Sequence, residues 1–241
     1  MIPYGRHKIY PEDIDAVTAV LKNSLLTQGE QVPLFEQSVC AYTGAGYGVA
    51  CNSGTSGLHL ACLALGVKEG DIVWTVPNSF AASANCARYC GAVIDFVDID
   101  PQTRNLCLNH LSQKLNEAAE NNTLPKALVV VHFAGHSCDT ASIAALTKPF
   151  GIALIEDAAH ALGGKDARGN AVGRCTYSLM TVLSFHPVKS ITSAEGGMVL
   201  TNDASLATLL RRYATHGINR DESLFEAENR DQPWFYTQLE L

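Results

Sequence analysis

One lysine stands in an otherwise uncharged run and is the strongest candidate for a catalytic residue in this sequence. Lys189 ends the stretch SFHPVK at 184–189, and hydroxyl residues and a Glu-Gly-Gly turn follow at 192–197. Burial and cationic neighbours lower the pKa of a lysine from about 10.4 and give it a neutral, nucleophilic amine. The pattern favours a lysine that bonds a carbonyl or moves a proton. An exposed loop lysine is the alternative that these residues leave open.

Small and hydroxyl residues fill 52–57, with the sequence NSGTSG, between an expected strand and an expected helix. The free N–H groups and the positive dipole end at the start of a helix suit a phosphate group. An ordinary capped helix start is the alternative. No lysine follows these glycines, so this is not an NTP-binding P-loop. The nearby GAGYG at 44–48 precedes a strand and has Val49 in place of the third glycine, which excludes a dinucleotide-binding loop.

Two further stretches follow apolar segments of strand length. Glu156 and Asp157 end the apolar run 152–155, and Ala-Ala-His160 comes next. A carboxylate in such a place is partly desolvated and needs a partner, such as a protonated ring nitrogen, although a helix cap or a salt bridge would also serve. Phe80 follows Asn78 and Ser79 after another strand. It could stack on a flat ligand, or it could belong to the core.

A competing cluster contains His132, His136, Cys138 and Asp139. Histidine, thiol and carboxylate groups after a strand could bind zinc. No second cluster in the sequence supplies obvious further ligands. We therefore expect no metal and a structural role for these residues.

The composition limits the class of protein. The chain has 241 residues, 47% hydrophobic and 17% charged, with a formal net charge of −7. Such a chain can form one sizeable core, and its acidity argues against a nucleic-acid partner. Apolar runs have strand length, the first residues lack a signal peptide, and the eight cysteines form no CxxC pair. We expect a cytoplasmic protein with reduced thiols and no membrane partner.

Alternating elements must position these residues. Apolar periodicity and caps predict helices at 11–22, 32–42, 56–65, 80–90, 108–119, 140–150 and 204–214. Short apolar runs predict strands at 47–51, 71–75, 93–97, 127–132 and 152–156, and shorter ones near 180–183 and 198–200. This alternation predicts an α/β fold with a mostly parallel sheet covered on both faces. Ligands bind such sheets at the carboxyl ends of the strands, where the stretches above lie.

The order and spacing of the motifs carry a resemblance. The motifs are NSGTS at 52–56, PNSF at 77–80, EDAAH at 156–160, SFHPVK at 184–189 and EGG at 195–197. In this order they resemble the DegT/DnrJ/StrS family of nucleotide-sugar aminotransferases, from Ile2 to the last residue. The family has a three-layer α/β/α large domain of PLP-dependent fold type I. The resemblance implies pyridoxal 5′-phosphate (PLP) as the cofactor.

The resemblance also implies a role for each candidate. Lys189 matches the lysine that bonds PLP and moves a proton during the reaction, and Asp157 matches the acid that keeps the pyridine nitrogen protonated. Gly54, Thr55 and Ser184 match residues on the phosphate side. Phe80 matches the aromatic that stacks on the ring, and His160 matches a position beside the ring. The positions that match contacts to the sugar nucleotide are Tyr4, Ser24, Leu25, Leu26 and Thr27.

The expected reaction is transfer of the amino group of glutamate to C4 of a UDP-4-keto-6-deoxy-N-acetylhexosamine. The stretches at 25–29, 95–98 and 131–139 resemble the family member with that substrate. The family implies a homodimer with the active site at the subunit interface. Another C3 or C4 sugar aminotransferase of the family and an inactive PLP-binding fragment are the alternatives. A sugar 3-dehydratase is disfavoured because those enzymes have histidine in place of Lys189.

The family pattern continues with a Gly-Tyr-Asn-Tyr-Arg-type segment and a smaller C-terminal domain. This sequence ends at Glu240 and Leu241, just before that segment. We therefore expect residues 1–241 to comprise an N-terminal segment and the large PLP-binding domain, without the small domain.

Overall fold

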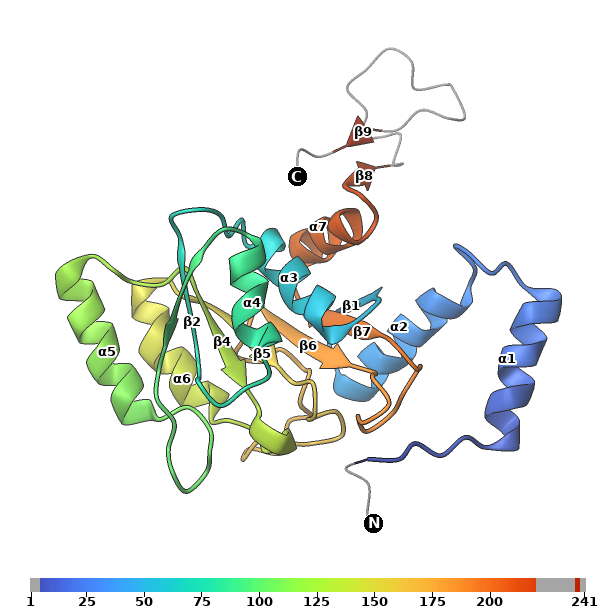
Figure 1. Cartoon of the computed structure of the whole chain (residues 1–241), viewed down its shortest axis with the longest axis horizontal. Helices are drawn as coiled ribbons and strands as arrows, with labels where there is room; N and C mark the ends of the chain where they lie inside the picture. The colour runs from blue at the N-terminus through green and yellow to red at the C-terminus, as the bar shows by residue number, and fades with distance from the viewer. Residues whose placement is uncertain (1–4, 220–236, 239–241) are drawn as a thin grey trace.

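The computed structural model of the chain describes residues 5–219 and 237–238. Its centre is a seven-stranded sheet in the order β1-β7-β6-β5-β4-β2-β3 (Figure 1). The strands are β1 (Tyr47–Cys51), β2 (Ile72–Thr75), β3 (Val93–Phe96), β4 (Ala127–Val131), β5 (Ala153–Asp157), β6 (Met180–Ser184) and β7 (Gly197–Thr201). Strands β3, β2, β4, β5 and β6 pair in parallel, and β7 runs antiparallel to both β6 and β1. The expected mostly parallel sheet is therefore confirmed.

Seven α-helices accompany this sheet in the described residues, and all but the first cover one of its faces. They are α1 (Pro11–Asn23), α2 (Gln31–Thr43), α3 (Gly54–Ala64), α4 (Ala82–Tyr89), α5 (Leu108–Asn121), α6 (Thr140–Thr147) and α7 (Ala204–Ala214). One core cluster joins α3, α4 and α7 to one face. A second cluster joins α5 and α6 to the opposite face, and a third joins α2 to that same face. The expected three-layer α/β/α architecture is confirmed.

The central strands are apolar because both of their faces are covered. Every residue of β4, with the sequence ALVVV, is buried. Side chains alternate between faces along a strand, so β5 places Ile155 and Asp157 on the side of α3 and α4. Leu154 and Glu156 point to the side of α5 and α6. The two acids that end β5 thus lie on opposite faces.

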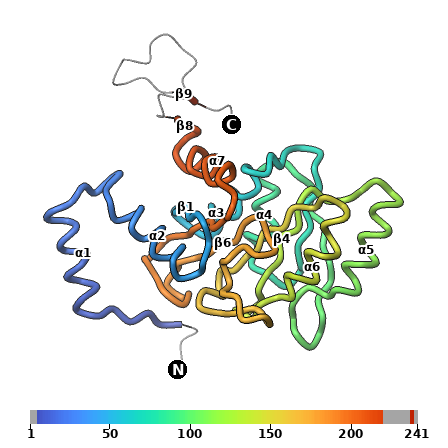
Figure 2. The backbone as a smooth tube through the Cα atoms, turned by 180° about the vertical axis from the view of Figure 1, so that it is seen from behind, coloured from blue at the N-terminus to red at the C-terminus, as the bar shows by residue number. Residues whose placement is uncertain are grey.

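Helix α1 differs from the other helices because none of its residues is buried. Figures 1 and 2 show it set apart from the sheet, joined to the body through α2. Its apolar row of Ile14, Val17 and Leu21 is 59–63% exposed. Within the part of the chain that the structure describes, no helix is long and apolar enough to cross a membrane.

Several helix boundaries differ from the sequence prediction by one to three residues, and two of the differences have a clear local reason. Helix α3 begins at Gly54 because Ser53 is its N-cap and accepts a hydrogen bond from the amide of Ser56. The predicted helix 140–150 ends at Thr147, and a 3-10 turn, η2 (Lys148–Phe150), follows. Pro149 lacks an amide hydrogen and cannot continue the α-helical ladder.

Candidate active site

Asp157 lies at the carboxyl end of β5 and is only 6% exposed. The hydroxyl of Ser83, on α4, donates to Asp157 Oδ2 at 2.6 Å, and the amide of Ala159 donates to Oδ1 at 3.2 Å. No salt bridge to Asp157 occurs among the described residues. A buried carboxylate with two neutral donors can still accept a hydrogen bond from a cationic N–H group.

Lys189 and His160 face one another beside this acid. Lys189 Nζ lies 2.7 Å from His160 Nε2. Partial burial lowers the pKa of Lys189, and the charge of Asp157 opposes that change. Partial burial and the charge of Lys189 lower the pKa of His160. A neutral His160 can accept at Nε2 from the lysine and so fix the position of the amine, while partial burial favours the neutral form of the amine.

The start of α3 forms a cradle with the ends of β6 and β7. A methyl group added at Gly54 would lie 2.9 Å from Ser184 Cβ, and one at Gly197 would meet the carbonyl of Ser53. Only glycine permits these close approaches. The first amides of α3 have no partner within the helix, and the Ser184 hydroxyl lies beside them. This donor set is suited to an anion such as a phosphate.

Phe80 lies two residues before the start of α4 and is 78% exposed. The alternative that Phe80 belongs to the core is therefore wrong. The amide of Ser83 donates to the Phe80 carbonyl at 3.1 Å, which ties this exposed aromatic to the helix that also carries the Ser83 hydroxyl. An exposed ring in this position is free to pack on a ligand.

The expected sugar-nucleotide residues are less closely tied to this centre. Residues 24–27 connect α1 and α2, with Ser24 half-buried and Leu25, Leu26 and Thr27 exposed. Tyr4 lies outside the described residues. Its neighbour Gly5 packs against Val188, where an added methyl group would lie 3.3 Å from Cγ1. The N-terminal arm therefore reaches the loop that carries Lys189.

Residues 7–230 match the DegT/DnrJ/EryC1/StrS aminotransferase family. The chain belongs to this family. It is 41% identical over 220 residues to the UDP-4-amino-4,6-dideoxy-N-acetyl-beta-L-altrosamine transaminase of Campylobacter jejuni. That alignment covers 90% of this chain and 56% of the relative, so the chain spans little more than half of the relative's length.

Solved structures of family aminotransferases share this fold. Helicobacter pylori PseC, an aminotransferase involved in the biosynthesis of pseudoaminic acid, superposes with a TM-score of 0.81 at 32% identity, covering 90% of this chain and 56% of PseC. The PMP form of a putative sugar aminotransferase from Streptococcus pneumoniae gives a TM-score of 0.84 at 25% identity. That superposition covers 100% of this chain and 62% of the other.

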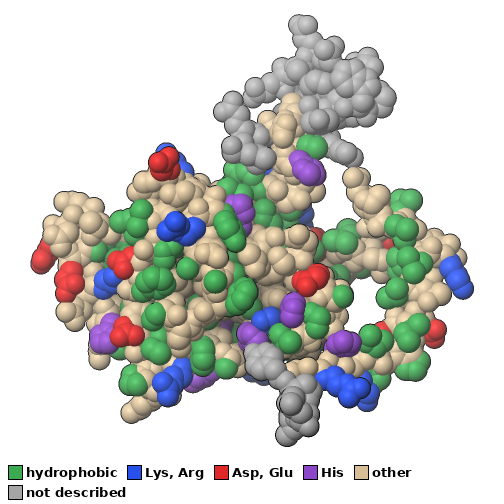
Figure 3. Space-filling model, viewed as in Figure 1, with side chains coloured by type: hydrophobic (Ala, Val, Ile, Leu, Met, Phe, Trp, Pro, Cys, Tyr) green, Lys and Arg blue, Asp and Glu red, His purple; other side chains and the backbone are tan. Residues whose placement is uncertain are grey.

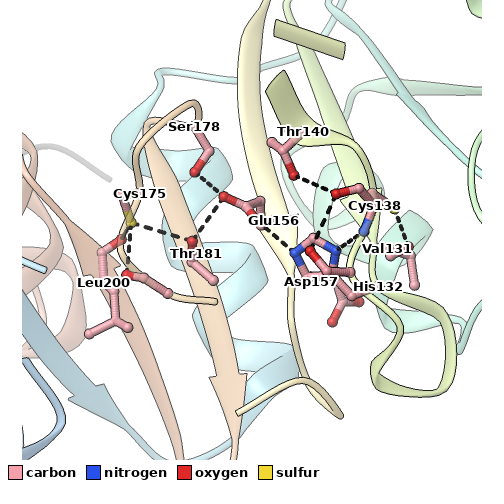
Figure 4. Close-up of polar contacts among 12 residues, drawn as sticks. Val131, His132, Cys138, Thr140, Glu156, Asp157, Cys175, Ser178, Thr181 and Leu200 are labelled. Atoms are coloured by element: carbon pink, nitrogen blue, oxygen red, sulfur yellow. Dashed lines mark hydrogen bonds and ion pairs between the residues drawn. The ribbon is translucent and has the colours of Figure 1, made fainter. Parts of the chain in front are cut away.

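In this family member, a second polar network lies on the face of β5 opposite Asp157 (Figure 4). His132 Nε2 lies 2.7 Å from Glu156 Oε2, and the amide of Cys138 donates to His132 Nδ1 at 3.1 Å. The hydroxyls of Ser178 and Thr181 donate to Glu156 Oε1. Burial raises the pKa of Glu156, but these hydrogen bonds and the nearby His132 outweigh burial and lower it. Glu156 is therefore a buried carboxylate with a full set of donors.

This network contains His132 and Cys138, two residues of the cluster that could have suggested zinc. Both ring nitrogens of His132 are engaged, and Cys138 Sγ donates to the Val131 carbonyl at 3.1 Å. His136 and Asp139 are exposed, and Asp139 caps α6 through the amide of Ser142. Among the residues that the structure describes, no group of three or more histidine, cysteine or acidic side chains could hold a metal ion.

The sequence analysis missed Ser83 and the pairing of Glu156 with His132. Ser79 lies in the loop before α4, outside the helix, so the spacing of the two serines held no helical periodicity that could have indicated their contact. The partner of Glu156 is 24 residues away and is fixed only by the pairing of β4 with β5, for which the sequence carried no local signal.

Proposed function

We propose that this chain is the PLP-binding part of a sugar-nucleotide aminotransferase. It would move an amino group from glutamate to C4 of a UDP-4-keto-6-deoxy-N-acetylhexosamine, as a step toward pseudaminic acid. The observation that carries the proposal is Lys189 Nζ at 2.7 Å from His160 Nε2, near the buried Asp157, in a chain of this family. The name of the Campylobacter relative supports this choice of sugar substrate.

The residues present fit PLP at three points. The cradle of Gly54, Thr55 and Ser184 offers amides and a hydroxyl to a phosphate dianion. Asp157 is a desolvated carboxylate that can pair with a protonated pyridine nitrogen. Phe80 presents an exposed ring for stacking. When bound, PLP supplies an electron sink for a carbanion at the substrate's amino-bearing carbon.

Lys189 has two tasks in this proposal. Its amine would hold the cofactor covalently, and, once the amine of glutamate displaces it from the cofactor, the freed amine would carry a proton from the amino-bearing carbon of the substrate to the cofactor. A lowered pKa suits both tasks because the amine must be neutral to attack and to accept a proton. His160 holds the amine in place by accepting a hydrogen bond from it, and its own lowered pKa keeps it neutral for this purpose.

Asp157 acts on the ring nitrogen through its charge. A carboxylate beside that nitrogen raises the nitrogen's affinity for a proton, and the protonated ring withdraws electrons more strongly. Burial strengthens this interaction because little water screens it. The hydrogen bonds from Ser83 and Ala159 compensate the carboxylate for the loss of water.

For the partners we propose the UDP-4-keto sugar, glutamate and a second copy of the chain. The sugar nucleotide would contact Tyr4 and residues 24–27, and Gly5, next to Tyr4, packs against Val188 beside Lys189. The apolar row of α1 is too exposed to be left in water, and a second copy would cover it in a homodimer with the site at the interface. A cytoplasmic location stays a prediction from the sequence.

A panel of possible substrates tests the proposed identity of the sugar. Purified protein with PLP and glutamate is given a panel of UDP-4-keto sugars, and the aminosugar products are identified by mass spectrometry and NMR. We expect amination at C4 of the N-acetylated 4-keto-6-deoxy sugar. Preferred amination at C3, or of a sugar without the N-acetyl group, would assign another activity of the family.

A further inference from the structure

Two serine hydroxyls form a chain that ends on Asp157. Ser79 Oγ lies 2.6 Å from Ser83 Oγ, and Ser83 Oγ lies 2.6 Å from Asp157 Oδ2. Ser83 is fully buried, at 0% exposed, and Ser79 is half-buried next to Phe80. The chain thus runs from the loop that carries the exposed aromatic to the buried acid.

The donors in this chain can be assigned from the chemistry of the groups. A carboxylate only accepts hydrogen bonds, and a hydroxyl has one proton to donate. Ser83 must therefore give its proton to Asp157. Since that proton is then in use, the hydrogen bond between the serines must come from Ser79. Hydrogen bonds that run in one direction polarise one another, so the Ser79 hydroxyl strengthens the bond from Ser83 to the carboxylate.

Two other buried hydroxyls in helices of this protein behave differently. Thr43 donates to the carbonyl of Val39, and Thr147 donates to the carbonyl of Ile143, each four residues earlier and each at 2.9 Å. That bond satisfies a buried hydroxyl without any partner outside the helix. The Ser83 hydroxyl points out of α4 to Asp157 instead. Burial alone therefore does not explain its direction.

We propose that Ser83 is a positioning residue that fixes the Asp157 carboxylate at the ring nitrogen of PLP. This inference rests on the proposed function. Ser83 holds Oδ2 while the Ala159 amide holds Oδ1, so the carboxylate cannot turn freely. The amide of Ser83 also binds the Phe80 carbonyl at 3.1 Å. Ser83 therefore links the buried acid, through its hydroxyl, to the backbone of the loop that carries Phe80, through its amide.

The test compares Ser83→Ala with Thr147→Ala, a matched loss of a buried helical hydroxyl away from the site. For each variant we would measure the dissociation constant of PLP and the ¹⁵N resonance of the ring nitrogen in labelled PLP. Kinetics of the glutamate half-reaction complete the set. Loss of a hydrogen bond to a charged group weakens binding by about ten-fold or more.

We expect Ser83→Ala to bind PLP about ten-fold more weakly, with the ring-nitrogen resonance moved toward its unprotonated position. It should also lower kcat for glutamate without a matching change in KM. Thr147→Ala should match the wild type in PLP affinity, ring-nitrogen resonance and glutamate kinetics. Ser83→Thr keeps the hydroxyl and should restore the wild-type resonance, and Ser79→Ala keeps the Ser83 donor and should have a smaller effect.

The outcomes separate this inference from the proposed function. If the wild type binds PLP and transaminates while Ser83→Ala has the affinity and resonance of Thr147→Ala, the positioning role is wrong and the proposed function stands. If Ser83→Ala shows the expected loss but the wild type makes no aminosugar, the positioning role stands and the reaction is wrong. A wild type that binds no PLP would overturn both.

Discussion

Lys189 should capture PLP at a lower pH than an ordinary lysine. Its pKa is lowered by partial burial, and Asp157 only partly opposes this. The neutral amine, which attacks PLP, forms as the pH rises through that pKa. The rate of covalent capture should therefore rise with pH and level off below about 10.4. The visible absorbance of the lysine–PLP adduct measures the rate.

Borohydride should then trap PLP on the peptide that contains Lys189. Lys189→Ala should abolish turnover, although PLP can still bind it without a covalent bond. Labelling of Lys148 or Lys165 would show that the lysine has been misassigned.

Asp157 should matter through its charge and not its volume. Asp157→Asn keeps the size of the side chain but cannot stabilise a protonated ring nitrogen. Each pK unit lost at that nitrogen corresponds to about 1.4 kcal/mol. The first half-reaction with glutamate should fall by orders of magnitude while the far-UV circular dichroism spectrum stays unchanged. Near-normal conversion of glutamate to 2-oxoglutarate by this variant would reduce Asp157 to a structural cap.

At the scale of elements, position 54, the first residue of α3, should tolerate no side chain. In Gly54→Ala the added methyl group meets Ser184 Cβ at 2.9 Å, so either the helix or β6 must move. PLP affinity should fall by about ten-fold as the phosphate donors separate. Gly46→Ala is a control for the loss of a glycine, since an added methyl group there makes only ordinary contacts, the nearest at 3.4 Å from Asn202 Oδ1. Equal PLP affinities of the two variants would show that the start of α3 does not bind the phosphate.

The pair of Glu156 with His132 should stabilise the ends of β4 and β5. His132→Ala leaves a buried carboxylate without its nitrogen partner, which typically costs about 3–5 kcal/mol. His136→Ala, at an exposed position of the same loop, should change stability by no more than about 0.5 kcal/mol. Urea unfolding followed by tryptophan fluorescence measures both. Bound zinc in stoichiometric amount, lost in His132→Ala, would support the metal site instead.

The sequence predicted the order of the elements because apolar periodicity and caps are local signals. Helix 204–214 and strand 47–51 were predicted with the bounds that the structure has. The motifs at 156–160 and 184–189 lie at neighbouring strand ends, and Lys189 lies against His160. The contact of Ser83 with Asp157 could not be predicted, because it depends on how α4 rotates against β5. The exposure of α1 likewise could not be predicted, because it depends on tertiary packing and not on the local sequence.

At the scale of the whole molecule, the apolar row of α1 predicts association. Val17→Asp places a charge in the row of Ile14, Val17 and Leu21, and it should shift the protein from dimer toward monomer in sedimentation at micromolar concentration. Ala19→Asp adds the same charge on the opposite side of the helix and should leave the dimer intact. Figure 3 shows the apolar side chains along α1. A wild type that sediments as a monomer at every concentration would refute the dimer.

Transfer of a labelled nitrogen tests the central claim most directly. The protein with PLP is given ¹⁵N-glutamate and a UDP-4-keto-6-deoxy-N-acetylhexosamine, and the product is analysed by NMR. The account predicts one ¹⁵N at C4 of the sugar for each 2-oxoglutarate formed, and none with Lys189→Ala. A sugar that loses its 3-hydroxyl group without gaining ¹⁵N, or transfer that persists in Lys189→Ala, would contradict it.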